Sequence, residues 1–277
     1  MTAMLIDTHC HLDAPEFAAD RAAVAERARA AGVGAIVNPS IAARTFADTV
    51  AVREAFGCLP AFGMHPMYLA EHRDEHLDLL RETLVRQQAV AVGEIGLDFF
   101  VPGLDAERQI ALLDAQLRIA RELDLPVLLH VRRAVDAVLK CLRRQRVRGG
   151  IAHAFNGSAQ QAQAFIDLGF KLGFGGAMTY PRALNLRRLA ADLPLESIVL
   201  ETDAPDMPPE WLNRGRNEPA ELPRIARLLA DLRGLPFEEV VAATTANALS
   251  VLNIHQSENL GGTSEAPSLS LPPLLRR

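Results

Sequence analysis

The sequence is poor in cysteine, and it has neither a long apolar run nor a strong excess of one charge. Its 277 residues include three cysteines, Cys10, Cys58 and Cys141, which lie far apart and form no Cys-x-x-Cys motif. This spacing argues against a disulfide framework or a zinc knuckle and favours a reducing compartment. No apolar stretch approaches the ~20 residues of a membrane-spanning helix, and the N-terminal residues lack the pattern of a secretion signal. We therefore expect a cytoplasmic protein.

The formal net charge is −5 at neutral pH, and 49% of the residues are hydrophobic. An acidic balance argues against a broad surface that coats nucleic acid, because such binding relies on many lysine and arginine contacts with phosphates. A local nucleic-acid-binding pocket remains compatible with this charge. The length and apolar content allow one large core, as in single barrel domains of ~250 residues.

Short apolar runs alternate eight times with segments that have helical spacing. The expected strands span about 4–9, 35–40, 59–64, 89–94, 125–130, 149–153, 171–176 and 197–203. Eight such units predict an α/β protein with a closed (β/α)8 TIM barrel. Asp105 is expected to cap the fourth helix, and two closing helices are expected near 221–233 and 236–251.

We expect one barrel domain over residues 1–255. Residues 256–277 are rich in serine, proline and glycine and show neither a helical nor a strand period. Segments of this composition cannot bury enough apolar surface to fold alone, so a disordered tail is favoured over a docking segment.

Histidines and carboxylates close several of the expected strands. They are His9 and His11 in LIDTHCHL, His65 in AFGMHP, Glu94 in VAVGEIGLD, His130 in PVLLHV, His153 in GGIAHAF and Asp203 in IVLETDAP. The carboxyl ends of barrel strands share one face, where active sites are built, so these side chains should converge. Imidazole and carboxylate groups are the ligands of hydrolytic metal centres.

Seven candidate ligands exceed the needs of one tetrahedral metal, which indicates two divalent ions, whether Zn²⁺, Mn²⁺ or Mg²⁺. Glu94 lies midway in the strand order and is the natural bridging ligand. His9 and His11 should point to the same side of the first strand, with Cys10 packed on the other. Barrel closure should bring Asp203 beside them, where it could also take a proton from the attacking water.

Several longer motifs identify a resemblance over roughly residues 4–252. They are LIDTHCHLD, GMHP, VGEIGLD, LPVLLHVR, HAFNGS, GFGGAMTYPRA, VLETDAPDMPP and GRNEP. The chain resembles the TatD family of metal-dependent deoxyribonucleases, and looks closest to its YjjV-like branch. The resemblance implies an amidohydrolase-like barrel that hydrolyses phosphodiesters.

The same resemblance implies roles for individual residues. One ion would be held by His9, His11, Glu94 and Asp203, and the other by Glu94, His130 and His153. His65 would lie near the reacting phosphate, and Glu201 would be a carboxylate beside the centre. Asn156 stands where serine is expected in many relatives, a change that bears on substrate contacts more than on metal binding.

Substrate contacts are less firmly indicated. Arg132 and Arg133 directly follow the fifth strand, where they would either grip phosphate or form a solvated helix start. Arg216 and Asn217 in GRNEP either bind substrate or hold the loop after strand eight. Trp211 and Tyr180 lie in rim loops and would either stack a splayed base or pack the loop.

The sequence thus predicts a metal-dependent phosphodiesterase that acts as an exodeoxyribonuclease on single-stranded or frayed DNA ends through a water activated by two metals. An acidic surface accepts a strand end more easily than a wrapped duplex. The alternative is a hydrolase of a small amide, lactone or phosphoester on the same barrel. Glu94 occupies the position where carbamylated amidohydrolases need a lysine, which weakens that alternative. A non-catalytic metal-binding barrel is a further alternative, but no ligand has been lost.

Overall fold

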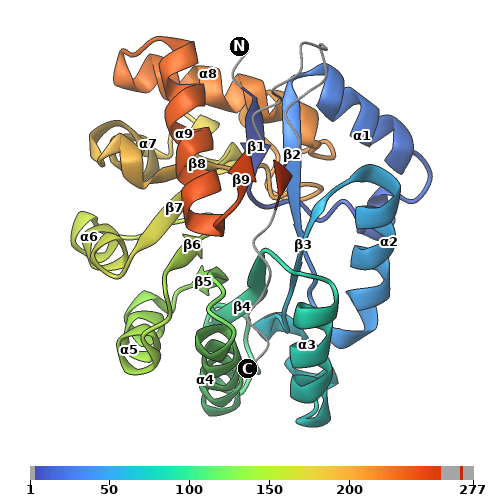
Figure 1. The fold of residues 1–277 in the computed structure, drawn as a ribbon. Helices are drawn as coiled ribbons and strands as arrows, with labels where there is room; N and C mark the ends of the chain where they lie inside the picture. Colours follow the sequence, from blue (N-terminus) through green and yellow to red (C-terminus); the bar gives the residue numbers. More distant parts are fainter. Residues whose placement is uncertain (1–3, 257–268, 271–277) are drawn as a thin grey trace.

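The computed structural model describes residues 4–256 and 269–270 of the chain. Eight parallel strands pair in sequence order and are surrounded by helices (Figure 1). They are β1 (Leu5–Asp7), β2 (Val33–Pro39), β3 (Leu59–Phe62), β4 (Ala91–Asp98), β5 (Val127–Arg132), β6 (Gly150–Ala152), β7 (Phe170–Phe174) and β8 (Ile198–Leu200). The Thr8 amide donates to the Leu200 carbonyl at 3.1 Å and joins the two ends of the sheet. The predicted TIM barrel is confirmed.

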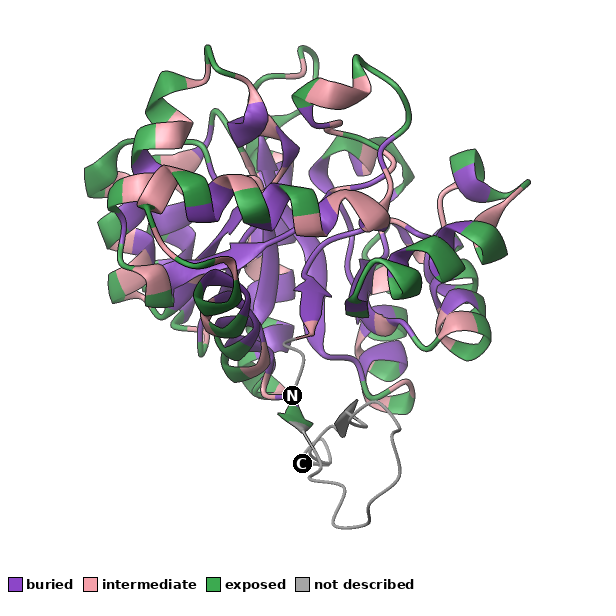
Figure 2. Ribbon diagram, turned by 90° about the horizontal axis from the view of Figure 1, so that it is seen from above, coloured by how far each residue is buried: buried purple, intermediate pink, exposed green. Residues whose placement is uncertain are grey.

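The α-helices cover the outside of the sheet. The described residues form α1 (Arg21–Ala30), α2 (Phe46–Phe56), α3 (Glu75–Arg86), α4 (Ala106–Glu122), α5 (Val135–Gln145), α6 (Ala159–Asp167), α7 (Leu184–Asp192), α8 (Leu222–Arg233) and α9 (Phe237–Leu252). Their outward faces are exposed, whereas the strands are almost wholly buried (Figure 2). The Asp105 carboxylate accepts from the amides of Glu107 and Arg108, so the predicted cap of α4 is present.

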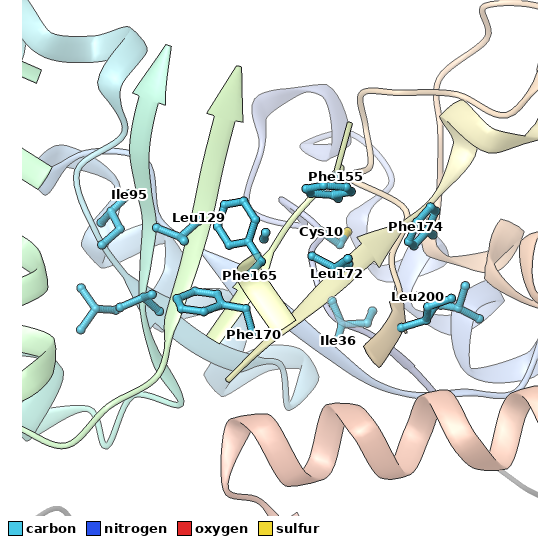
Figure 3. Close-up of a cluster of buried hydrophobic side chains, with 14 of the residues drawn as sticks. Cys10, Ile36, Ile95, Leu129, Phe155, Phe165, Phe170, Leu172, Phe174 and Leu200 are labelled. Atoms are coloured by element: carbon cyan, nitrogen blue, oxygen red, sulfur yellow. The ribbon is translucent and has the colours of Figure 1, made fainter. Parts of the chain in front are cut away.

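Two layers of apolar side chains hold the barrel together. The outer layer lies between strands and helices and includes the edge-to-face rings of Phe155, Phe165 and Phe170 (Figure 3). Burial of each such ring contributes roughly 1.5–3 kcal/mol. Cys10 is fully buried in this layer, as expected (Figure 3).

The inner layer joins residues near the beginnings of the strands to α9. Ile6, Val37 and Leu128 share this cluster with Val251 and Leu252. Helix α9 thus seals the amino-terminal end of the barrel (Figure 1). The opposite end, where the strands finish, is left for the candidate site.

Some strand boundaries differ from the prediction. Strand β1 ends at Asp7 and β8 at Leu200, so His9, His11 and Asp203 lie just beyond the strands. Strand β4 continues to Asp98 instead of ending near Glu94. The polar and glycine residues of GEIGLD suggested an earlier end, but this stretch is buried and stays paired with β5.

The C-terminal segment is described only in part. Strand β9 (His255–Gln256) pairs antiparallel with β10 (Leu269–Ser270). Residues 257–268 and 271–277 lie outside the described residues, and for them the expected disorder stays a prediction. None of the described helices is long and apolar enough to cross a membrane.

Candidate metal centre

Glu94 is the centre of the predicted cluster and is buried to 98%. Its Oε2 lies 3.2 Å from Nε2 of His9 and 3.4 Å from Nε2 of His11. Its Oε1 lies 3.1–3.2 Å from one nitrogen of each remaining imidazole, those of His65, His130 and His153. The two oxygens therefore face two separate groups of histidines.

Asp203 completes the first group. Its Oδ1 lies 3.8 Å from Nε2 of both His9 and His11. The Asp203 amide donates to the carbonyl of His9 at 2.8 Å, which fixes the carboxylate above β1. Burial raises the pKa of Asp203 to about 6, so this side chain exchanges a proton near neutral pH.

The donor atoms fit divalent metal ions. Three triplets of ligand atoms lie within 4.8 Å of one another, namely His9–Glu94–His153, His9–His11–Asp203 and His65–Glu94–His130. Nitrogen and carboxylate donors at this density are typical of zinc and similar transition metals. The grouping of Glu94 with both His130 and His153, which the resemblance implied for one ion, is not among these triplets. Both rings nevertheless face the same Glu94 oxygen.

Polar groups behind three imidazoles orient one ring nitrogen of each toward Glu94, through hydrogen bonds for His11 and His130 and through an ion-pair contact for His153. Nδ1 of His11 donates to the Pro39 carbonyl at 3.1 Å. His130 is oriented the other way round, with Nε2 donating to Asp98 at 3.0 Å and Nδ1 turned to Glu94. In His153, Nδ1 faces Oε1 of Glu201 at 3.6 Å. A carbonyl or carboxylate behind the ring is the usual partner of a metal-ligating histidine.

His65 differs from these three rings. Its Nδ1 accepts a hydrogen bond from the amide of Met67 at 3.1 Å. Burial lowers the pKa of His65, so the ring is neutral and carries its one proton on Nε2. The N–H, and not a lone pair, therefore points at the centre. This geometry favours hydrogen-bond donation over metal ligation.

His9 and His153 stack with ring centroids 4.0 Å apart. Burial lowers the pKa of His9 to about 3, which keeps its ring neutral. Burial opposes protonation of His153 as well, but the charges of Glu94 and Asp203 raise its pKa well above the ordinary value. Without an ion His153 therefore carries a second ring proton and a positive charge, and a bound metal must displace the proton on the nitrogen that faces Glu94.

Two carboxylates support the centre from behind. Glu201 is 99% buried and accepts from the amide of Ala154. Gly173 makes room for it, because a Cβ at that position would lie 2.2 Å from the Glu201 carboxylate. Glu201 thus lies behind His153, on the side of that ring turned away from Glu94.

The second carboxylate, Asp98, was not predicted. Its Oδ2 accepts from His130, and its Oδ1 accepts from the amides of Phe100 and Val101. A strand places every second side chain on one face, so Glu94 and Asp98 share the inner face of β4. This alternation would have identified Asp98 as a site residue if the predicted fourth strand had been extended from residue 94 to residue 98.

The loop after β8 shows what Arg216 and Asn217 do. The Arg216 guanidinium donates to both oxygens of Asp20 at 2.7 Å and to Glu218 at 2.8 Å. Asn217 is fully buried, and its amide donates to the carbonyls of Thr202 and Asp206. Of the two roles left open by the sequence, the geometry favours holding the loop.

The other predicted substrate contacts lie at the rim. Arg132 and Arg133 are exposed at the end of β5, and Asn156 is exposed three residues after His153. The geometry does not test whether these three residues contact a substrate, so their roles stay predictions.

A family model described as TatD related DNase matches residues 6–253. The chain belongs to the TatD-related DNase family. It is 45% identical over 258 residues to an Escherichia coli K12 protein described as metal-dependent hydrolase YjjV, covering 92% of this chain and all of that protein. The crystal structure of E. coli YjjV superimposes with a TM-score of 0.88 at 44% identity, covering 91% of this chain and 99% of that one.

A second relative is 34% identical over 260 residues, which are 90% of this chain and the full length of a Pantoea vagans protein named 3'-5' ssDNA/RNA exonuclease TatD. Membership of the TatD family confirms both the predicted resemblance and the prediction of a metal-dependent hydrolytic enzyme with nuclease relatives.

Proposed function

We propose that this TatD-family enzyme hydrolyses phosphodiester bonds at single-stranded or frayed DNA ends, with two divalent ions held on either side of Glu94. The main observation behind the proposal is that the two oxygens of the Glu94 carboxylate face different sets of imidazoles. A carboxylate shared in this way suits a bridging ligand. A nuclease relative named for single strands supports the substrate class.

Residues on each side of Glu94 would hold one ion. His9, His11 and Asp203 would serve the first, and His130 and His153 the second, since one ring nitrogen of each histidine faces Glu94. When bound, two divalent ions lower the pKa of water and offset the negative charge of the phosphate. Zinc, manganese and magnesium are all compatible with this ligand set.

The chain's own groups would move the protons. The Asp203 carboxylate, which lies 3.8 Å from Nε2 of both His9 and His11, would accept the proton of the attacking water. His65 offers its Nε2–H to the phosphate or to the departing oxygen. A carboxylate base on one side of Glu94 and a neutral imidazole acid on the other suit in-line displacement at phosphorus.

Strand ends fit this centre better than duplex DNA. The acidic overall charge disfavours wrapping of a duplex, and the cations near the centre are restricted to the rim. We also propose a cytoplasmic location, since all three cysteines are free and buried.

The test is digestion of 5′- and 3′-labelled single strands by chelator-treated protein, with Zn²⁺, Mn²⁺ or Mg²⁺ added back singly. Stepwise shortening from one labelled end that depends on added metal is expected. Closed circular DNA, cyclic amides, lactones and small phosphoesters serve as comparison substrates. Turnover of a small amide or lactone, with intact strands, would replace this proposal by the alternative hydrolase.

A further inference from the structure

Strands β4 and β5 remain paired up to the rim of the metal centre. Asp98 and Arg132 are register partners, and the amide of Phe99 donates to the Arg132 carbonyl at 2.9 Å. The side chains at the ends of these two strands are therefore held by backbone hydrogen bonds beside His130. We call Phe99, Phe100, Arg132 and Arg133 the rim platform.

The aromatic part of this platform is unusually exposed. Phe99 is 38% and Phe100 is 46% exposed, whereas the other nine phenylalanines are buried or half-buried. Burial of these two adjacent rings would stabilise the protein, yet both are exposed beside the candidate active site. Exposed apolar surface at such a place indicates that a bound molecule covers it.

The cationic part lies against the same ring. The guanidinium carbon of Arg132 is 3.9 Å from the centroid of the Phe100 ring, and that of Arg133 is 5.0 Å away. Arg133 has a φ of +53°, a left-handed turn that lets two consecutive side chains reach one ring. Such cation–π contacts hold guanidinium groups in place without neutralising their charge.

These arginines retain their affinity for anions. The carboxylate nearest to Arg132 is Asp98 at 3.9 Å, which already accepts from His130 and two backbone amides. Arg133 makes no ion pair within residues 4–256 and 269–270. The platform therefore offers an apolar ring together with one unpaired and one weakly paired guanidinium group next to a cluster of carboxylates.

We propose that the rim platform binds an unpaired nucleobase next to the phosphate held at the centre, with Phe100 as the stacking surface and Arg132 and Arg133 as contacts to the flanking phosphates. Aromatic rings and arginines interleaved in this way are the surface that single-stranded nucleic acid uses. The proposal rests on the proposed function, because it assumes a nucleic-acid strand at Glu94.

The two aromatic residues that the sequence suggested for stacking are already engaged. The Trp211 indole is half-buried and donates to Glu221 at 2.7 Å. The Tyr180 hydroxyl donates to the Pro208 carbonyl. Both rings pack their loops, which leaves the rim platform as the better stacking site.

The test measures binding of a fluorescent single-stranded decamer with cleavage-resistant phosphorothioate linkages to the Zn²⁺-loaded full chain by anisotropy at low salt. Replacing one base at a time by an abasic sugar should reveal a position at which the wild-type chain loses about 5- to 100-fold in affinity. The Phe100→Ala variant should bind the intact strand more weakly by the same factor. Its affinity should not change further when the base at that position is removed. Phe100→Tyr should restore both properties, because it keeps the ring.

Control variants separate stacking from charge. Leu79→Ala removes an exposed apolar side chain on α3 and should leave binding unchanged. Arg132→Gln and Arg133→Gln should weaken intact and abasic strands equally and lower the salt dependence of binding by about one counterion each. Arg143→Ala, which changes an exposed arginine late in α5, should not do so.

The outcomes distinguish this proposal from the proposed function. Equal binding of intact and abasic strands by the wild-type chain, or no binding at all, would overturn the stacking site even if strands are cleaved. A Phe100-dependent preference for an intact base in a chain that cleaves no phosphodiester would support the stacking site and refute the nuclease. Retention of that preference by Phe100→Ala would assign it to another surface and overturn the proposal.

Discussion

Nε2 of His65 lies 3.2 Å from Oε1 of Glu94. Because Nδ1 of the same ring accepts from the Met67 amide, the hydrogen of this contact belongs to His65. The centre thus contains one imidazole that is set to donate among others that are set to ligate.

His65→Gln should lower kcat by about 100-fold or more while leaving the bound metal unchanged, because a proton donor is lost and no ligand is. Metal content after gel filtration and steady-state rates on a labelled strand measure the two effects. His11→Gln is the contrasting variant and should lose metal. His76→Gln, on α3, should behave as wild type. A metal-depleted His65→Gln protein would show that the ring is a ligand.

Glu94→Gln keeps the size of the side chain but removes the charge on which both groups of histidines converge. We expect both ions to bind more weakly. Activity should fall by more than the ~100-fold that is typical when a residue hydrogen-bonded to a metal ligand is lost. Metal titration by calorimetry and circular dichroism of the metal-free chain measure affinity and folding. Glu107→Gln, an exposed residue of α4, is the control. A folded Glu94→Gln protein with full activity would exclude a bridging role.

The sequence predicted the barrel well because its apolar runs are regular and parallel strands buried on both faces leave a strong pattern. The grouping of His9, His11 and Glu94 was predicted from the rule that the carboxyl ends of barrel strands share a face, although His9 and His11 lie beyond β1 and Glu94 lies within β4. What could not be predicted was which nitrogen of each ring faces inward. That choice depends on Pro39, Met67 and other partners whose backbone groups approach only in the folded chain.

The platform was missed for a related reason. Phe99 and Phe100 continue an apolar pattern and look like core residues, whereas their exposure depends on where β4 emerges from the barrel. For Trp211 and Tyr180 the sequence left stacking and loop packing open, because the hydrogen bonds that engage them form only in the folded chain.

Asp98→Asn should weaken metal binding by about 10- to 100-fold. The carboxylate accepts a hydrogen bond from Nε2 of His130. In asparagine the side-chain oxygen would stay on the amides of Phe100 and Val101, so its NH2 group would face His130 and donate to it. The ring proton would then move to Nδ1 and occupy the lone pair that faces Glu94. The ¹⁵N chemical shifts of the His130 ring report the tautomer directly. Asp231→Asn on α8 is the control, and an unchanged tautomer with reduced metal affinity would assign Asp98 another role.

The ion pair between Asp20 and Arg216, here called the clamp, holds the loop after β8 and should weaken at acidic pH. The hydrogen bond from Arg216 lowers the pKa of Asp20 to about 2, against 3.8 for an ordinary aspartate. A carboxylate whose pKa is depressed in the folded chain stabilises it fully above the unfolded pKa. The stabilisation is lost as the pH falls from about 4 through the folded value of about 2.

Asp20→Asn should therefore lower Tm by roughly 1–4 °C at pH 7, and this difference should stay constant down to pH 5 and shrink below pH 4. Thermal unfolding followed by circular dichroism from pH 7 to pH 3 measures it. Glu26→Gln removes the exposed ion pair with Arg29 on the same helix and should leave Tm unchanged, since an isolated surface pair contributes little. A Tm difference between wild type and Asp20→Asn that grows on acidification would contradict the clamp, because it would mean that the folded chain binds this proton more readily than the unfolded chain.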